Sequence, residues 1–415
     1  MTTTKPFAIS KRSIWNAYKQ VKANRGAAGI DRQSMEDFEK DLRGNLYKIW
    51  NCLSSGSYYP PPVKQVGIPK KDGGTRYLGV PTVADRVAQT VVKQQLEPLW
   101  DPHFHPDSYG YRPNRSAKGA IAATRKRCWR FDWVVEFDIK GAFDNIDHEL
   151  LMKAVRKHAP EQWMVLYIER WLTASVVTPD GQTIARTQGT PQGGVISPLL
   201  MNLFLHYAFD RWMSGEYPNN PFARYADDAV VHCHTHEEAA ALLDAIATRL
   251  NDCKLTLHPD KSKVVYCKDG KRRRDHEHVQ FTFLGFTFRP RSAKGRGGEL
   301  FTAFLPAVSN EAMKQMRKTI RGWKLHRRTS TELKVLARSV NPVLQGWWNY
   351  YGSFYPSAMR DVFHYFDRKL MLWGRRKYRR LRGRLLASFA WLERVASEHP
   401  RLFVGWQHFG LASAR

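Results

Sequence analysis

The spacing of hydrophobic positions divides the chain into stretches of different character. Residues up to about Tyr58 show a polar helical pattern, which the Tyr-Tyr-Pro-Pro-Pro sequence at 58–62 ends. The segment 63–80 predicts two short strands around a Gly-Gly turn, and 83–100 returns to helical spacing. From 133 to 288, short β-rich runs alternate with helical ones. This mixture predicts an α+β fold rather than a repeating parallel one.

Beyond Pro306 the strand signals stop and the composition changes. Residues 321–384 carry 16 Lys and Arg against 3 Asp and Glu, together with Trp323, Trp347, Trp348 and Trp373. A helical, basic and aromatic composition is typical of a surface that holds a nucleic-acid backbone and stacks on exposed bases. We therefore expect a helical nucleic-acid-binding domain, which follows a Gly-rich basic joint at 294–299.

The whole chain is strongly basic. Its 415 residues include 66 Lys and Arg against 38 Asp and Glu, a net charge of +28, which predicts nucleic acid or an anionic membrane as a partner. The most apolar run, 195–205, is interrupted by polar residues and is far shorter than the ~20 residues that a membrane span needs. The N-terminus lacks a signal peptide, and the five cysteines form no C-x-x-C pair. We therefore expect a soluble cytoplasmic protein, associated with the bacterial nucleoid through nucleic acid and not with a membrane.

Three acidic residues adjoin apolar strands. Asp138 ends the run 133–138, and Asp227 and Asp228 interrupt the run 222–232. Adjacent acids in apolar surroundings repel each other and lose hydration, a cost that bound cations relieve. We therefore expect two Mg²⁺ ions ~3.5–4 Å apart, one activating an attacking hydroxyl and the other steadying a leaving phosphate. Taken alone, the Asp pair is also compatible with a polar hairpin turn.

Two further segments carry weaker signals. The Gly-Thr-Pro-Gln-Gly-Gly loop at 189–194 precedes a helix start at Ser197 and Pro198, and its free N–H groups suit a phosphate or a base pair. The histidines and cysteine at 232–236 alternate in a way that could ligate zinc. No fourth ligand is placed by the sequence, so a polar strand face is the favoured interpretation.

Sequence blocks in a fixed order identify a family. In chain order they are IPKKDG (68–73), YGYRP (109–113), FDIKGAF (137–143), TPQG (190–193), YADD (225–228), KLTLHPDKSK (254–263) and FLGF (283–286). With these blocks the chain resembles a reverse transcriptase. NRGAAGID at 24–31 and NPVLQGWWNYY at 341–351 are similar to the N-terminal extension and the maturase thumb of the group II intron-encoded class.

The resemblance implies a right-hand polymerase. It implies an antiparallel palm sheet flanked by helices, with fingers before it and an all-helical basic thumb or maturase domain after it. The implied domains are an N-terminal extension with fingers (1–125), a palm with the remaining fingers segments (126–295), a thumb (300–385) and a short DNA-binding remnant (386–415). No endonuclease is expected at this end, so intron mobility would have to borrow a primer.

The resemblance also assigns the site residues. The implied catalytic and metal set is Asp138, Asp227 and Asp228, with Ile139 at the metals and the nucleotide. The other implied nucleotide contacts are Lys70, Arg76, Phe143 and Gln192. Lys71 competes with Lys70 for the triphosphate, and the Phe143 ring would exclude ribonucleotides unless it is an ordinary packing aromatic. Two Mg²⁺ ions are implied, with Mn²⁺ as a possible substitute.

The basic run at 375–384 is the expected RNA contact. The residues assigned to it are Arg375, Arg376, Lys377, Arg379 and Arg380. Any single one of these side chains is more simply explained as part of a solvated helix face. As a group, beside aromatic rings, they are typical of a surface that tracks phosphates.

The predicted function is RNA-directed DNA polymerisation combined with intron splicing and retromobility. The expected partners are intron or other structured RNA, an RNA template, a DNA primer and deoxynucleoside triphosphates, joined by two-metal phosphoryl transfer. A free-standing relative in DNA repair or phage defence is one alternative. An RNA-binding splicing factor without polymerase activity is another, although the intact acids argue against it. The oligomeric state is left open.

Overall fold

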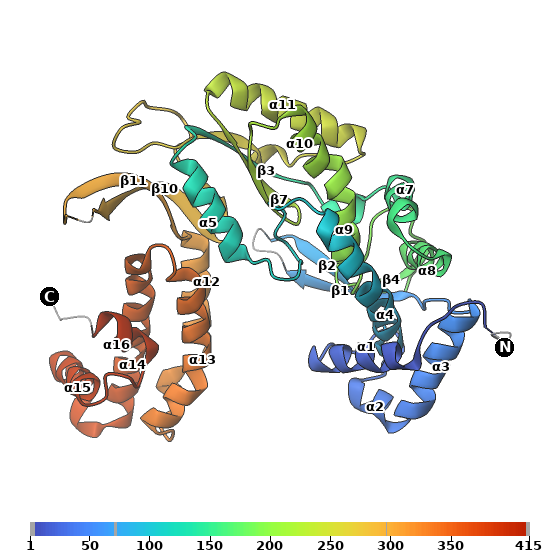
Figure 1. The fold of residues 1–415 in the computed structure, drawn as a ribbon. Coiled ribbons are helices and arrows are strands. Elements are labelled where there is room, and N and C mark those ends of the chain that lie inside the picture. Colours follow the sequence, from blue (N-terminus) through green and yellow to red (C-terminus); the bar gives the residue numbers. More distant parts are fainter. Residues whose placement is uncertain (1–4, 70–72, 296, 412–415) are drawn as a thin grey trace. The chain divides into compact units, whose positions relative to one another are not determined.

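The chain forms two compact units of mixed helices and strands in the computed structural model, which describes residues 5–69, 73–295 and 297–411 (Figure 1). The first unit combines the residues up to 120 with 135–264, and the second combines 121–134 with the residues from 265 onward. The predicted α+β class is confirmed. None of the helices within the described ranges has the length and apolar character needed to cross a membrane.

The N-terminal part of the first unit is helical and includes α1 (Lys11–Ala23), α2 (Met35–Lys40), α3 (Leu42–Ser55) and α4 (Val83–Trp100). Helix α1 buries Ile14, Ala17, Tyr18 and Val21, the 3–4 spacing of one helical face, and this helix packs on α3 and α4. Its N-cap Ser10 accepts a hydrogen bond from the Ser13 backbone N–H.

The predicted hairpin at 63–80 is present. Strands β1 (Val63–Pro69) and β2 (Thr75–Val80) pair antiparallel with Pro69 opposite Thr75. The hairpin extends into a four-stranded sheet of order β2-β1-β4-β5 through β4 (Val176–Val177) and β5 (Thr183–Ile184). Residues 70–72 of the hairpin, which include Lys70 and Lys71, lie outside the described residues.

A second four-stranded sheet has the order β6-β7-β3-β8. Its strands are β3 (Trp133–Asp138), β6 (Phe222–Tyr225), β7 (Asp228–Cys233) and β8 (Lys263–Tyr266). In the antiparallel pair β6–β7, Tyr225 lies opposite Asp228, so Ala226 and Asp227 form the turn. The hairpin interpretation of the Asp pair is therefore correct, and it places both acids at the end of a buried sheet.

Helices precede and follow these strands along the chain. The remaining helices of the first unit are α6 (Ala142–Asn145), α7 (His148–His158), α8 (Gln162–Thr173), α9 (Ser197–Leu205), a π-helical turn (His206–Asp210), α10 (Arg211–Glu216) and α11 (His236–Asp252). Short 3-10 turns occur at Asp101–His103 and Pro259–Lys261. Helix α9 begins at Ser197 with Pro198 in its first turn, as the sequence predicts. Helix α5 (Ala117–Cys128) and strand β3 each contribute to both units.

The second unit contains a three-stranded antiparallel sheet of order β11-β10-β9, formed by β9 (Phe281–Phe283), β10 (Phe286–Lys294) and β11 (Leu300–Val308). The segment expected to be a joint, 294–299, begins in β10, whose Lys294 pairs with Leu300 of β11, and residue 296 lies outside the described residues. Strand β11 ends at Val308, which belongs to the core cluster of the helices that follow. The sheet and those helices belong to the same compact unit.

Five main helices complete this unit. They are α12 (Asn310–Gly322), α13 (Leu333–Tyr351), α14 (Arg360–Lys377), α15 (Leu385–Glu398) and α16 (Val404–Phe409), with 3-10 turns at Leu325–Arg327, Pro356–Met359 and Arg379–Leu381. One hydrophobic cluster runs through all of them and includes Trp373, Trp391 and Trp406. The last two helices therefore share a core with residues 300–385 rather than standing apart.

Candidate active site

Asp227 and Asp138 form an acidic centre at the end of the β6-β7-β3-β8 sheet. Asp227 lies in the β6–β7 turn and is half-buried, and Asp138 is the last residue of β3. Burial, and then repulsion from Asp138, raises the pKa of Asp227 above its ordinary value, whereas Arg76 and Lys261 act in the opposite direction. The two carboxylates therefore lie within electrostatic range of each other.

A cation already lies beside these acids. The Lys261 Nζ donates a hydrogen bond to Asp138 Oδ2 at 2.7 Å, from the 3-10 turn that follows His258. The His258 backbone N–H donates to the Asp138 carbonyl at 2.8 Å, which fixes this turn against the end of β3. The sequence blocks include Lys261, but its role beside Asp138 becomes visible only in the folded chain.

Asp138 and Asp227 have the chemistry of a divalent-cation site. Among the described residues, no group of three or more His, Cys, Asp and Glu is arranged to hold a metal ion, the 232–236 segment included. Asp228 starts β7 opposite Tyr225. Hard carboxylate oxygens that repel each other, one of them already bonded to an ammonium group, suit a hard divalent cation.

The predicted nucleotide residues Arg76 and Gln192 come together. Arg76 Nε donates to Gln192 Oε1 at 2.6 Å, and Gln192 Nε2 donates to Asp144 Oδ2 at 2.7 Å. Phe143 is buried in α6, and its carbonyl accepts from the Thr190 backbone N–H at 2.7 Å. Ile139 is also buried and forms a β-bridge with Leu257, so its backbone rather than its side chain adjoins the acids.

Tyr111 is a site residue that the sequence did not single out. Its ring centroid lies 6.0 Å from that of Tyr225, and burial followed by the charges of Tyr225 and Asp227 raises the pKa of its phenol. Half of its side chain remains exposed, and its backbone is left-handed with φ 55°. The position of Tyr111 beside the turn follows from the fold of the YGYRP block rather than from local sequence.

A buried arginine supports the turn that carries Asp227. Arg224 and Asp210 form a two-bond ion pair, Nε to Oδ1 at 2.7 Å and Nη2 to Oδ2 at 2.6 Å, with side chains 1% and 0% exposed. Arg224 Nη1 also donates to the Ala226 carbonyl at 3.0 Å. Ala226 has the left-handed φ of 57°, unusual for a residue with a side chain. The guanidinium therefore holds a strained turn directly before Asp227.

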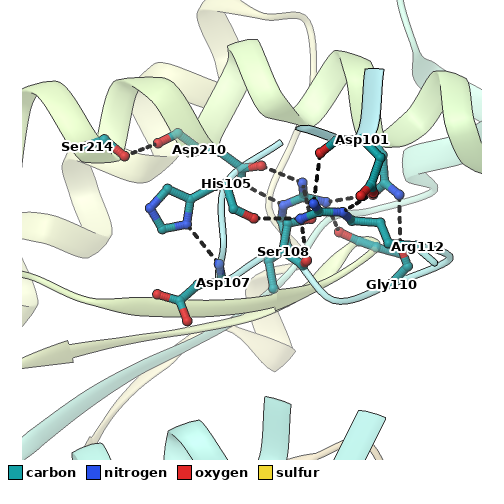
Figure 2. Close-up of polar contacts among 11 residues, drawn as sticks. Asp101, His105, Asp107, Ser108, Gly110, Arg112, Asp210 and Ser214 are labelled. Atoms are coloured by element: carbon teal, nitrogen blue, oxygen red, sulfur yellow. Dashed lines mark hydrogen bonds and ion pairs between the residues drawn. The ribbon is translucent and has the colours of Figure 1, made fainter. Parts of the chain in front are cut away.

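The 101–112 loop contacts this pair through Ser108, whose Oγ accepts from Arg224 Nη2 at 2.9 Å, and a second arginine, Arg112, organises the loop (Figure 2). Arg112 donates to Asp101 Oδ1 at 2.7 Å and to the carbonyls of His105 and Ser108 at 2.7 and 2.8 Å. Gly110 then passes so close to the turn that a Cβ there would lie 2.5 Å from the Ala226 nitrogen. Only glycine fits at this approach. The YGYRP block is thus a brace for the acidic turn.

The basic run of the second unit is divided between structure and surface. Arg375 and Arg376 line a hollow together with His326, Arg327 and Arg382. Arg379 and Arg380 are exposed. Lys377 instead donates to the carbonyls of Thr329 and Thr331 at 3.0 and 2.9 Å, so its charge serves the fold. Trp373 is fully buried, which corrects its expected place on the nucleic-acid surface.

Comparisons with known proteins agree with the motif order. The family model described as reverse transcriptase (RNA-dependent DNA polymerase) matches residues 68–288, and the group II intron maturase-specific domain matches 313–389. Protein YkfC of Escherichia coli (strain K12) is 32% identical over 305 residues, which cover 64% of this chain and 77% of that protein. The group II intron-encoded protein LtrA of Lactococcus lactis subsp. cremoris is 37% identical over 193 residues, 46% of this chain and 32% of LtrA.

A solved telomerase structure from Candida albicans aligns with a TM-score of 0.46 and 10% identity, over 91% of this chain and 68% of that one. The family assignment depends instead on the sequence matches, because the reverse transcriptase model covers more than half of the chain. The chain belongs to the reverse transcriptase family and carries a group II intron maturase-specific domain after the polymerase region.

Proposed function

We propose that this protein is an RNA-directed DNA polymerase that extends a DNA primer with deoxynucleoside triphosphates. The observation that carries the proposal is the meeting of Asp138, Asp227 and Arg76, with Arg76 also hydrogen-bonded to Gln192 of the TPQG loop. Paired acids, a cation and a polar loop are what phosphoryl transfer requires, because it needs positioning and charge neutralisation more than acid–base groups.

Each side chain of the site has a distinct task in this proposal. Asp138, Asp227 and Asp228 would hold two Mg²⁺ ions, and when bound these ions would activate the primer hydroxyl and neutralise the developing charge on the phosphates. Arg76 and Gln192 bind and orient the incoming triphosphate. The Phe143 ring limits the space at the sugar, and Lys261 balances the charge of Asp138 in the absence of metal.

The experiment is primer extension on an RNA template by the wild-type protein, with Mg²⁺ and deoxynucleotides. We expect cDNA that disappears with EDTA and is not formed from ribonucleotides. A parallel reaction with Mn²⁺ tests the choice of metal. A folded protein that binds RNA and yields no cDNA with either metal would overturn the polymerase proposal in favour of a splicing factor without polymerase activity.

We further propose that the second unit binds intron or other structured RNA and assists its splicing and mobility. The support is the match to the maturase-specific domain, together with the basic hollow lined by Arg375 and Arg376. LtrA is, by its name, encoded in a group II intron. An origin outside an intron would fit the alternative of a free-standing polymerase in DNA repair or phage defence.

Replacing Arg375, Arg376, Arg379 and Arg380 by Gln is expected to weaken RNA binding and flatten its salt dependence. The slope of log K against log salt should fall by ~0.7–0.9 for each phosphate that the variant no longer binds. Filter binding between 50 and 300 mM salt measures this slope. Arg394→Gln is the matched control, because Arg394 is exposed in the same unit and pairs with Glu398. An unchanged slope in the quadruple variant would show that these arginines do not bind the RNA.

A further inference from the structure

We propose that Asp85 and Gln89 are positioning residues of the polymerase reaction, which set the backbone of the loop that carries Gln192. The inference rests on the proposed polymerase function. Neither residue belongs to the acidic centre or to the predicted nucleotide contacts. Both lie in the first two turns of α4, one helical turn apart, and are 1% and 2% exposed.

Asp85 is the anchor of a buried hydrogen-bond chain. Its Oδ1 accepts from the Tyr58 hydroxyl at 2.8 Å and from Trp171 Nε1 at 2.7 Å. Its Oδ2 accepts from Gln89 Nε2 at 2.9 Å. An ionised carboxylate can only accept, so all three neighbours must present donors to it.

Gln89 links the Asp85 carboxylate to the backbone of the loop. Because its NH₂ group faces Asp85, its Oε1 must face the other way, where it accepts from the backbone N–H groups of Val195 at 2.8 Å and Ile196 at 3.3 Å. The polarity of every link is therefore fixed by the carboxylate. Val195 and Ile196 connect the TPQGG sequence at 190–194 to the start of α9.

The same loop is held from its other side by β2. The Gly79 backbone N–H donates to the Gln192 carbonyl at 2.7 Å, and Gly193 has φ 116° with the Gly79 oxygen 2.6 Å from where a Cβ would lie. The Gln192 backbone is thus bonded to β2 and its side chain to Arg76, and the loop is bonded to the Gln89 amide three residues later, at Val195. Within the loop the Gly194 backbone N–H donates to the Pro191 carbonyl at 3.0 Å, so a displacement at Val195 is passed to the turn that contains Gln192.

A purely stabilising role explains the Asp85–Gln89 hydrogen bonds less well than a positioning role. Burial raises the pKa of Asp85 to about 6 although three donors oppose the rise, so the ionised carboxylate costs folding free energy at neutral pH. A buried charge that lowers stability and imposes one orientation on an amide fits a positioning role.

The test exchanges donors and acceptors along the hydrogen-bond chain from Asp85 to the loop. In Asp85→Asn, Trp171 Nε1 can only donate, so the new amide keeps its oxygen there and turns its NH₂ toward Gln89. The Gln89 amide must then flip and present its NH₂ to the Val195 and Ile196 donors. Gln89→Glu alone sets two carboxylates face to face. We expect each single variant to lower kcat/KM for the deoxynucleotide by roughly 10–100-fold, mainly through KM.

The double variant Asp85→Asn with Gln89→Glu restores a donor facing an acceptor at every link. We expect its kcat/KM to return to within about threefold of the wild type, a coupling that independent sites do not show. Gln89→Met, which keeps the volume without the amide, should raise KM in the same way and serves if a single polar variant does not fold.

Thr90→Val is the matched control. Thr90 is buried in the same helix and its hydroxyl donates to the Arg86 carbonyl rather than to the loop, so its loss should lower the melting temperature and leave KM unchanged. An active wild type whose double variant is no better than the worse single variant would overturn the positioning role alone. An equal rise of KM in Thr90→Val would do the same. An inactive wild type would overturn the polymerase function and this inference with it.

Discussion

Asp227→Asn is expected to abolish RNA-templated primer extension while RNA affinity stays within about twofold of the wild type. In the proposed mechanism the acid would hold the cations that neutralise the transferring phosphates, and its loss should lower the single-turnover rate by roughly a thousandfold, about 4 kcal/mol. The proposed RNA contacts are basic residues elsewhere in the chain. Single-nucleotide extension under enzyme excess and filter binding on the same preparation separate the two effects.

Although it abolishes extension, Asp227→Asn is not expected to lower the stability of the protein. Burial and Asp138 raise the pKa of Asp227 in the folded chain, so ionisation of this carboxyl costs folding free energy above the pH at which it titrates. The cost is absent at low pH, where the group is protonated in both states, and appears as pH rises through the unfolded pKa. The metal-free Asn variant should therefore melt at the same temperature as the wild type or higher at neutral pH.

Asp244→Asn is the control for this change, because Asp244 is an exposed acid of α11 and its loss alters the net charge equally. We expect wild-type extension from it. If Asp227→Asn lost RNA binding and melting temperature along with extension, the acid would be structural and the metal assignment would fail.

The acidic centre was predictable because its carboxylates occur next to apolar strand sequences. Asp138 ends an apolar run and Asp227 separates two of them, and a buried charge needs a partner wherever it occurs. The β1–β2 hairpin was predictable from its Gly-Gly turn. The partners of these elements were not, since Lys261 reaches Asp138 from 123 positions along the chain. Local sequence carries no information on such a contact.

The basic aromatic domain shows a different limit. Composition suggested that Trp373 stacks on nucleic acid, yet Phe366, Leu370 and Trp373 follow the 3–4 spacing of one buried face of α14. The spacing of apolar residues therefore predicts that Trp373 is buried, whereas the basic and aromatic composition suggested that it is exposed. Strand β11 was not predicted, and its last residue, Val308, packs in the core cluster of helices that follow it in the sequence.

Arg224 is the largest omission, and its removal is expected to unfold much of the first unit. Arg224→Met leaves Asp210 as an uncompensated buried charge and removes the donors to Asn202 and the Ala226 carbonyl. Breaking a buried pair from one side costs about 3–5 kcal/mol. Urea unfolding measures this loss. Arg211→Met, one residue into α10 and exposed, should change stability by less than about 0.5 kcal/mol.

Replacing both partners distinguishes stability from positioning. Arg224→Met with Asp210→Leu removes the unpaired charge, and buried pairs replaced by apolar residues regain most of the lost stability. The Ala226 carbonyl still lacks its donor, so the left-handed turn before Asp227 is no longer held in its orientation. We therefore expect the free energy of unfolding of the double variant to lie within about 2 kcal/mol of the wild-type value. We expect the same variant to extend primers roughly a hundredfold more slowly. Recovery of both stability and extension would show that the turn needs no guanidinium, and that Arg224 serves only to neutralise Asp210.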